Sequence, residues 1–404
     1  MPGKFLHPFA KPARETFITI ARGDGALLWD TDGRQLIDGM ASLWYCAIGH
    51  GRAQMAQAIS NQITTLESYS AFDPFTNAPA DQLATRISDL SPLPDARVFL
   101  CSSGSEAIDS AMKMARLAHV QAGHPERTII ISRTRAYHGT NYGGTSAQGI
   151  VPNKVGYGTL LDDVIQVDAD DIEALSLVMS EYGPRLAAVL AEPIQGAGGV
   201  FPPDAGYLTS LRKLCNQHGA YLIFDEVITA FGRLGTWFGA TYYDVKPDMI
   251  TFAKAVTSGY IPLGGVIVGE HVCAALESDS NFFMRHGYTY SGHATACVAA
   301  ITNLDILENE GLLQRSVHIG HRLKLGLESL ADDGIISHAR GEGAVWAAAL
   351  NPDQDAVKIR DRMLELGAIT RAINDANTFC PPLVITDSQL DSLIDIFAAA
   401  ASGK

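Results

Sequence analysis

The sequence predicts an α/β protein with a large domain built on a mainly parallel sheet and a smaller α+β domain after it. Through the middle of the 404-residue chain, short apolar runs bounded by Gly, Pro or Asp alternate with stretches of helical periodicity. This alternation is typical of a mainly parallel, buried sheet. After about residue 296 the pattern changes to long amphipathic helices, which indicates a second structural unit.

The elements follow in order along the chain. Apolar runs predict the strands, and amphipathic stretches predict the helices. We expect strands at 98–101, 128–132, 186–191, 221–224 and 249–252, and helices at 106–121 and 208–217. We then expect helices at 296–309 and 312–330 and strands near 335–339 and 345–350. The expected domains are an N-terminal segment 1–44 that joins the small domain, a large domain 45–295 and a small domain 296–404.

Composition and charge exclude several classes of function. Hydrophobic residues make up 47% and charged residues 18% of the chain, which excludes a disordered protein. The chain has 44 acidic residues against 30 Lys and Arg residues, so its net charge is −14. A surface of this charge repels phosphate backbones and anionic lipids, so we expect neither a nucleic-acid nor a membrane partner.

Cysteine spacing and the absence of targeting segments indicate a soluble, cytoplasmic protein. The six cysteines are scattered and form no CxxC pair, so we expect reduced thiols and no metal site. The first residues, MPGKFLHPFAKPARE, lack the apolar run of a signal peptide. The longest uncharged stretches, such as 286–304, are too rich in Gly, Ser, Thr and His to cross a bilayer. A GxGxxG fingerprint is absent, which argues against a nicotinamide oxidoreductase.

Two charged positions follow neighbouring strands of the predicted sheet. Asp225 ends one apolar run, which places a carboxylate at the edge where α/β sheets bind ligands. Lys254 ends the next run and is flanked by apolar residues. Loss of hydration favours the neutral amine, which forms Schiff bases with carbonyl compounds. Taken alone, a helix cap would also explain Asp225, and a lysine extending from a sheet edge would explain Lys254.

Two further segments indicate binding sites for a phosphate group and for a flat heteroaromatic ring. The sequence CSSGSEA at 101–107 joins a strand to a helix, and a helix N-terminus with hydroxyls and Gly binds anions such as phosphate. Ordinary helix capping by Ser105 and Glu106 remains an alternative. Tyr137 lies beside a Gly-rich loop, where its ring can stack on a heteroaromatic ligand or simply pack. Together these groups are the ones needed to hold pyridoxal 5′-phosphate (PLP).

At these residues the sequence resembles the class III (subgroup II) PLP-dependent aminotransferases of fold type I. The similarity extends from about Gly39 to Thr386. It rests on motifs that occur in the family's order, namely SSGSEAIDSAMKMAR, YHG, AEPIQGAGGV, LIFDEVITAFGRLG, TFAKAVTSGYIPLGG and GYTYSGHATACVAA. The resemblance implies the fold of the fold type I PLP-dependent transferases.

The resemblance also implies a role for each matching residue. Lys254 would form the Schiff base with PLP and then move the proton between the substrate Cα and the cofactor, and Asp225 would pair with the pyridine nitrogen. The other cofactor contacts would come from Ser103, Gly104 and Ser105 at the phosphate, Tyr137, His138, Val227 and Glu192 around the ring, and Thr289 from the neighbouring subunit. A homodimer or tetramer with active sites at the subunit interface follows from this last role.

Two features resemble the amine:pyruvate (ω-) transaminases within the family. Trp44, in SLWYC, matches a Trp that lines their substrate pocket, although a core Trp would fit as well. Arg371, in ITRA, matches an Arg that binds the carboxylate of the amino or keto acid and moves away for uncharged amines. We expect a loop at 374–377, near which the long Arg371 side chain could move out to solvent. The implied reaction is ping-pong transfer of an amino group from a primary amine or ω-amino acid to a keto acid such as pyruvate.

Several alternatives remain open. Another class III PLP enzyme, such as a diamine, GABA or β-alanine-type transaminase, a decarboxylating transaminase or an aminomutase, would use the same cofactor groups. Product analysis separates these reactions. A non-catalytic PLP sensor fused to a DNA-binding head would need a basic helix-turn-helix segment, and only a short segment precedes the matching motifs.

Overall fold

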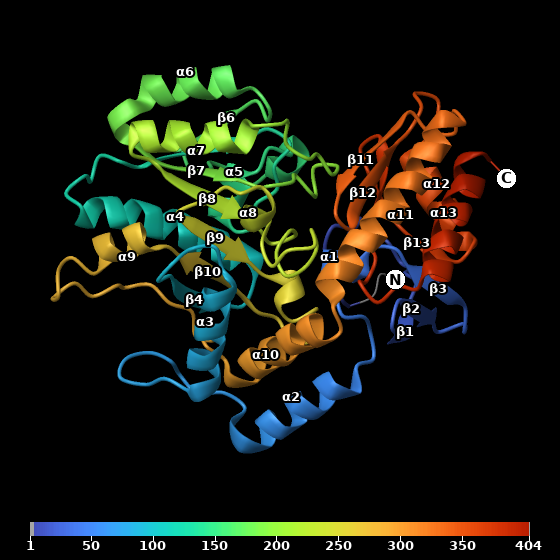
Figure 1. Ribbon diagram of the computed structural model, residues 1–404, viewed down its shortest axis with the longest axis horizontal. Coiled ribbons are helices and arrows are strands. Elements are labelled where there is room, and N and C mark those ends of the chain that lie inside the picture. The colour runs from blue at the N-terminus through green and yellow to red at the C-terminus, as the bar shows by residue number, and fades with distance from the viewer. Residues whose placement is uncertain (1–3, 404) are drawn as a thin grey trace.

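The strands in the described part of the chain form three separate sheets. The structure is a computed structural model that describes residues 4–403. Within these residues the chain builds one sheet of seven strands and two sheets of four strands. Figure 1 shows the seven-stranded sheet on the left and both smaller sheets on the right, joined by the orange helices of the C-terminal part.

The seven-stranded sheet is mainly parallel, in the order β4-β10-β9-β8-β7-β5-β6. Strands β6, β5, β7, β8 and β9 run parallel to their neighbours, whereas β10 is antiparallel to both β9 and β4. The strand bounds are Arg97–Cys101 (β4), Ile129–Arg133 (β5), Val164–Val167 (β6), Leu186–Ala191 (β7), Tyr221–Asp225 (β8), Met249–Phe252 (β9) and Gly264–Val268 (β10).

Both faces of this sheet are buried under helices. Alternate residues of β8 point to opposite faces, so Leu222 and Phe224 pack with residues of α7, whereas Ile223 packs with residues of α4 and α9. Because neither face meets solvent, its strands are continuous apolar runs. The helices of this part are α3 (Ala78–Leu90), α4 (Gly104–Gln121), α5 (Tyr142–Ala147), α6 (Ile172–Tyr182), α7 (Tyr207–His218), α8 (Gly239–Tyr242) and α9 (Glu270–Leu276), with 3-10 turns η1 (Val151–Lys154), η2 (Gly183–Arg185) and η3 (Lys254–Val256).

One of the two smaller sheets joins the beginning of the chain to its end. Strand β13 (Ala368–Ile369) pairs in parallel with β3 (Gln35–Asp38), which continues into β2 (Leu27–Asp30) and β1 (Ile20–Asp24). The other sheet has the order β11-β12-β15-β14. Its strands are β11 (His338–Glu342), β12 (Val345–Ala349), β15 (Ala376–Phe379) and β14 (Arg371–Ile373).

Long helices connect the sheets. Helix α10 (Ala294–Asn309) packs on α3 and on α2 (Ala53–Leu66), whereas α11 (Leu312–Asp332) packs on β11 and β12. The remaining helices are α12 (Ala356–Glu365), α13 (Asp387–Ala401) and the short, distorted α1 (Ala41–Trp44). We keep the domain limits at 44/45 and 295/296 as a proposal.

Most of the predicted elements agree with the structure to within two or three residues. The runs 186–191 and 249–252 match β7 and β9 without any difference. Helix α4 begins two residues earlier than predicted because the Ser103 side chain caps it by accepting the amide proton of Glu106. Strand β11 begins at His338 instead of near 335, because α11 extends to Asp332 and a turn at Gly334 (φ +72°) follows it.

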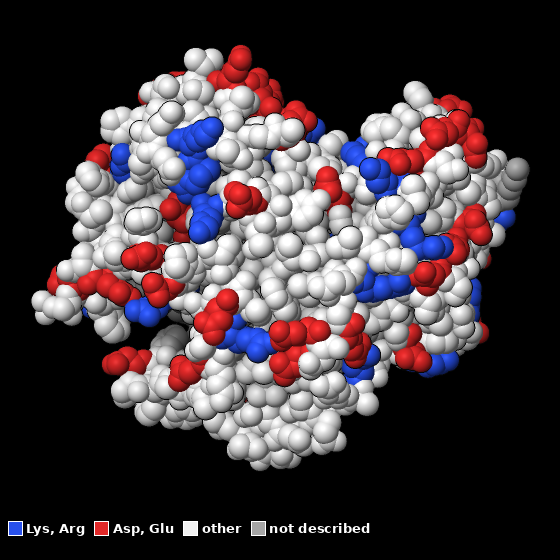
Figure 2. Space-filling view, viewed as in Figure 1, with Lys and Arg blue, Asp and Glu red and all other residues white. Residues whose placement is uncertain are grey.

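Charges are interspersed over the face drawn in Figure 2, where the surface over α2 is uncharged. The sequence of α2, AQMAQAISNQITTL, contains no ionisable side chain. Within residues 4–403, no helix combines the length and the apolar character that a membrane span requires.

Candidate active site

Lys254 lies just after β9, in the 3-10 turn η3, with a backbone φ of +48°. Part of the Lys254 side chain is accessible to solvent, but its amino group is surrounded by protein and desolvated. This burial lowers the pKa of Lys254 to about 8, although the carboxylates of Asp225 and Glu192 act in the opposite direction. Lys254 therefore has an amine that is substantially neutral at mildly alkaline pH.

Asp225 is the last residue of β8 and is held on both carboxylate oxygens. Its Oδ2 lies 2.8 Å from Nδ1 of His138, and the two side chains are buried. Its Oδ1 accepts the amide proton of Val227 at 3.1 Å and the hydroxyl proton of Thr251 at 3.3 Å. The carboxylate is therefore fixed in orientation at the C-terminal edge of the sheet.

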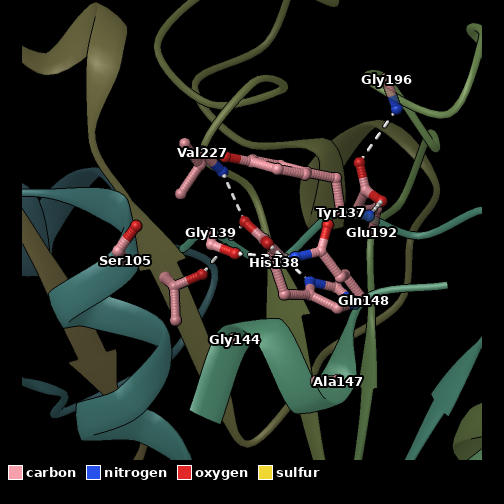
Figure 3. A network of polar contacts seen from close by, with 12 residues as sticks. Ser105, Tyr137, His138, Gly139, Gly144, Ala147, Gln148, Glu192, Gly196 and Val227 are labelled. Carbon is pink, nitrogen blue, oxygen red and sulfur yellow. Dashed lines mark hydrogen bonds and ion pairs between the residues drawn. The ribbon is translucent and has the colours of Figure 1, made fainter. Parts of the chain in front are cut away.

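Glu192 follows β7 and forms the next group of the site. It is buried, its Oε1 accepts the amide proton of Tyr137 at 3.0 Å, and its Oε2 accepts that of Gly196 at 2.9 Å. Burial raises the pKa of Glu192, His138 acts against this shift, and Asp225 adds to it. Figure 3 shows how these bonds gather Tyr137, His138 and Glu192 around the end of the sheet.

The N-terminus of α4 packs tightly against the loop that follows β5. The Ser105 hydroxyl accepts the amide proton of Thr140 at 3.0 Å. A Cβ atom on Gly139 would lie 2.5 Å from Oγ of Ser105, and one on Gly104 would lie 3.1 Å from both methyl groups of Val227. Gly139, which also has φ +89°, therefore has no room for a side chain, and a side chain at Gly104 would have to displace Val227 slightly. These close approaches leave the first amides of α4 beside Val227, in a place suited to an anion.

These residues fit PLP by their chemistry. A desolvated amine, an oriented buried carboxylate and a helix N-terminus meet at one edge of the sheet, and PLP requires a partner for its aldehyde, its pyridine nitrogen and its phosphate. Among residues 4–403, Nε2 of buried His138 has no hydrogen-bond partner, so this ring has a polar atom still available.

The structure brings the two predicted substrate residues to the same region. Arg371 is close enough to Tyr137 and Lys254 for its guanidinium to favour a lower pKa at both, although burial raises the pKa of Tyr137 overall. Trp44 is buried among apolar side chains that include Ile194 and Ile228, which follow Glu192 and Asp225 in sequence.

The loop predicted at 374–377 is confirmed for its first two residues and wrong for the other two. Ala376 and Asn377 belong to strand β15, and Asn374 and Asp375 form the turn of the β14–β15 hairpin. Asn374 adopts φ +52° and its side-chain amide donates to the carbonyl of Gly198. The hairpin register pairs Arg371 with Thr378, so the main chain at Arg371 is fixed.

Thr289 is exposed in the segment between α9 and α10. The sequence reasoning missed Thr251, which bonds to Asp225, and Cys380, whose buried thiol lies near Lys254. Thr251 could have been found from the sequence, because its hydroxyl stands in the otherwise apolar strand MITF. Cys380 lies more than a hundred residues after Lys254 in the chain, and no local pattern indicates their proximity.

Comparison with known proteins places this geometry in a family. Residues 9–401 match the family model described as aminotransferase class-III. The putrescine–pyruvate aminotransferase of Pseudomonas aeruginosa is 34% identical, covering 93% of this chain and 89% of that protein. The β-alanine–pyruvate aminotransferase of the same organism is 35% identical, covering 95% and 92%. The PLP-bound crystal structure of an amine transaminase from an uncultivated Pseudomonas species superposes with a TM-score of 0.95, at 34% identity over 100% of this chain and 99% of that chain.

Proposed function

Because this chain belongs to the class III aminotransferases, we propose that it transfers an amino group from a primary amine or ω-amino acid to a keto acid such as pyruvate. The reaction is ping-pong, with one half-reaction for the donor and one for the acceptor. Similar proteins support this choice of substrates, since two of them are named for pyruvate together with putrescine or β-alanine, and a third is named an amine transaminase.

The observation that carries the proposal is the desolvated Lys254 amine beside the fixed carboxylates of Asp225 and Glu192. When bound, PLP supplies an electron sink for the charge that develops at the substrate Cα. Lys254 would hold the aldehyde carbon of the cofactor and then take the proton from the substrate Cα, a transfer that suits an amine with a pKa of about 8. Asp225, oriented by His138, would keep a proton on the pyridine nitrogen.

The remaining predicted residues would hold the cofactor and the substrate. Ser103, Gly104 and Ser105 would bind the phosphate through the N-terminus of α4. Tyr137 and Val227 would contact the ring, with Glu192 beside it. Trp44 would line the substrate pocket, and Arg371 would bind the substrate carboxylate in the two-pronged geometry that a guanidinium offers.

Oligomeric state and compartment belong to the same proposal. Large apolar side chains are exposed on and after α2, namely Ile63, Leu66, Tyr69, Phe72 and Phe75. An exposed apolar surface of this kind is suited to a second copy of the chain. A homodimer would bring the exposed Thr289 of each subunit to the other subunit's phosphate site. All six cysteines are buried and unpaired, which suits the reducing conditions of the cytoplasm.

Peptide mapping tests the assignment of Lys254. The purified protein should be yellow, and borohydride should convert its cofactor linkage to a stable secondary amine on Lys254. Exposed Lys246 provides the comparison within the same chain. The Lys254→Ala variant should bind PLP weakly and lose amino transfer from 1-phenylethylamine to pyruvate. A reduced cofactor found on Lys246, or amino transfer retained by Lys254→Ala, would overturn the assignment.

A further inference from the structure

A buried asparagine of α10 holds the turn that carries Lys254. Asn303 has no accessible surface, and its Nδ2 donates to the carbonyls of Ala255 at 2.9 Å and Val256 at 3.0 Å. Its Oδ1 accepts the hydroxyl proton of Ser258 at 2.6 Å. Only one orientation of the amide satisfies these three bonds, because the two carbonyls need a donor and the Ser258 hydroxyl finds an acceptor in Oδ1.

The turn held by Asn303 is strained. Lys254 has φ +48° and Ser258 has φ +50°, backbone conformations that residues other than Gly rarely adopt. Gly259 follows with φ +79°, and the Tyr45 ring lies so close that a Cβ atom there would be 2.4 Å from it. Strained residues persist when the surrounding contacts impose their conformation. Asn303 supplies such contacts, since it fixes the two carbonyls that follow Lys254.

The same network extends to the segment that carries Trp44. The hydroxyl of Ser258, which donates to Asn303, also accepts the amide proton of Ile48 at 3.2 Å. The segment before Ile48 is strained as well, with φ +46° at Ala41, +59° at Ser42 and +70° at Trp44. One hydrogen-bond chain from Asn303 through Ser258 to Ile48 therefore joins the lysine turn to the segment of Trp44.

We propose that Asn303 is a positioning residue that holds Lys254 in its strained turn, and that Ser258 couples this turn to the segment of Trp44. The proposal rests on the proposed function, in which Lys254 carries the cofactor. Asn303 does not touch the reacting atoms. It acts through the backbone of residues 254–258, so its loss displaces the Lys254 amine without removing it.

Asn303 variants of the holoenzyme test the first part. In Asn303→Ala the carbonyls of Ala255 and Val256 lose their buried donor, and the turn can relax. We expect the rate constant of the half-reaction with 1-phenylethylamine to fall about tenfold to a hundredfold, since misplacement of about 1 Å costs this much. We also expect the pH midpoint of the visible cofactor absorbance to differ from that of the wild type. Asn303→Asp keeps the acceptor for Ser258 but loses both donors, and should be impaired at least as much.

Asn351 provides the matched control. Its Nδ2 also donates to two consecutive carbonyls, those of Gly334 at 3.1 Å and Ile335 at 3.4 Å, in the turn after α11 and outside the candidate site. Asn351→Ala should lower the melting temperature but leave the half-reaction and the absorbance titration unchanged. If Asn303→Ala behaves in the same way, Asn303 is merely structural and the proposal is wrong. Borohydride mapping of the wild type separates this result from failure of the Lys254 assignment.

Ser258→Ala tests the coupling separately from the positioning role of Asn303. It leaves the bonds from Asn303 to Ala255 and Val256 intact but removes the link to Ile48. We expect the half-reaction rate constant to remain within about threefold of the wild type, while the ratio of KM values for a bulky and a small amine changes more than this. Unchanged KM values for both amines would contradict the coupling to Trp44.

Discussion

At Asp225, one substitution can remove the negative charge and keep the hydrogen bonds of the side chain. Its carboxylate accepts hydrogen bonds from the Val227 amide and the Thr251 hydroxyl and contacts His138. An asparagine would keep an oxygen for the first two groups and an amide for the third, so Asp225→Asn should retain the fold. Because a neutral amide cannot hold a proton on the pyridine nitrogen, we expect the half-reaction to slow by about 10³, or several kcal/mol at the transition state. Stopped-flow measurement with 1-phenylethylamine checks this.

Asp248 is the control for this change. It lies just before β9, near the other end of the strand pair β8–β9, where it binds Arg212 at 2.7 Å and accepts the amide proton of Leu222 at 2.7 Å. Asp248→Asn should lower stability and leave the half-reaction rate constant unchanged. A near-normal rate constant in Asp225→Asn would show that another carboxylate meets the cofactor nitrogen.

The depressed pKa of Lys254 links stability to pH in the cofactor-free protein. Burial lowers this pKa from 10.5 to about 8 in the folded state. Below about pH 8 both folded and unfolded chains bind the proton, so the cost of burying the charge is constant. Between about pH 8 and 10.5 the unfolded chain binds more protons, so the contribution of Lys254 to the free energy of unfolding rises with pH, by roughly 3 kcal/mol in all.

Comparison with Lys254→Met isolates this contribution. Methionine carries no charge at any pH, so the variant should exceed the wild type in stability most at pH 8 and below. That advantage should shrink as the pH rises to about 10.5. Urea unfolding of both cofactor-free proteins at several pH values measures the difference. A difference that is constant across this range would mean that the Lys254 amine has an ordinary pKa in the folded protein.

At the scale of elements, the β14–β15 hairpin determines how Arg371 can move. Pairing with Thr378 and the anchor from Asn374 to Gly198 fix its main chain, so only the side chain can turn towards or away from the substrate. Arg371→Ala should raise the KM for pyruvate strongly, because a charge-assisted pair worth roughly 1.5–3 kcal/mol is lost. The half-reaction with 1-phenylethylamine, which has no carboxylate, should change much less.

Arg97 is a suitable comparison for Arg371. It begins β4, pairs with Glu277 at 3.2 Å and is exposed. Arg97→Ala should leave both half-reactions unchanged. Equal loss of both half-reactions in Arg371→Ala, or unchanged pyruvate kinetics, would rule out its role as a movable carboxylate ligand and leave it as a structural residue.

Local sequence patterns predict some of these elements and not others. Strands β7 and β9 are apolar on both faces because helices cover both, so their bounds follow from the apolar runs. Asn374 and Asp375 form a turn, as their residue types favour, but the predicted loop extends too far because Ala376 and Asn377 already belong to β15. The hydrogen bonds from Asn303 to the Lys254 turn could not be predicted. They join α10 to a turn about fifty residues earlier, and Asn303 lies in an ordinary helical sequence.

At the scale of the whole molecule, the candidate site depends on all three sheets. Lys254 and Asp225 come from the seven-stranded sheet, Arg371 from the sheet of β14, and Trp44 from the segment after β3. The motifs predicted the residues on the large sheet because those residues follow strands directly. Segments more than three hundred residues apart, such as those of Trp44 and Arg371, are joined by the parallel pairing of β3 with β13, for which no local pattern gives the geometry.

The subunit arrangement gives the last prediction. Thr289 is exposed and lies two residues from both Gly287 and Ser291, which line one cavity together with the exposed apolar residues Phe72 and Phe283. If this surface joins two copies of the chain, the Thr289 hydroxyl can reach the partner's phosphate. Thr289→Val keeps the shape and loses the hydroxyl, so it should weaken PLP binding about tenfold, as expected for one hydrogen bond to a charged group, without dissociating the dimer. Equilibrium dialysis combined with analytical ultracentrifugation measures both quantities.

Dilution separates this role from a contact within one subunit. If the partner completes the phosphate site as proposed, release of PLP from the wild type should follow dissociation of the dimer as the protein concentration falls. Ser278→Ala, in the same exposed segment, removes a hydroxyl that bonds only to the nearby carbonyl of Ala275 among residues 4–403, and should change neither quantity. A stable monomer that binds PLP as tightly as the undiluted protein would show that each chain completes its own site, and Thr289 would then have no part in cofactor binding.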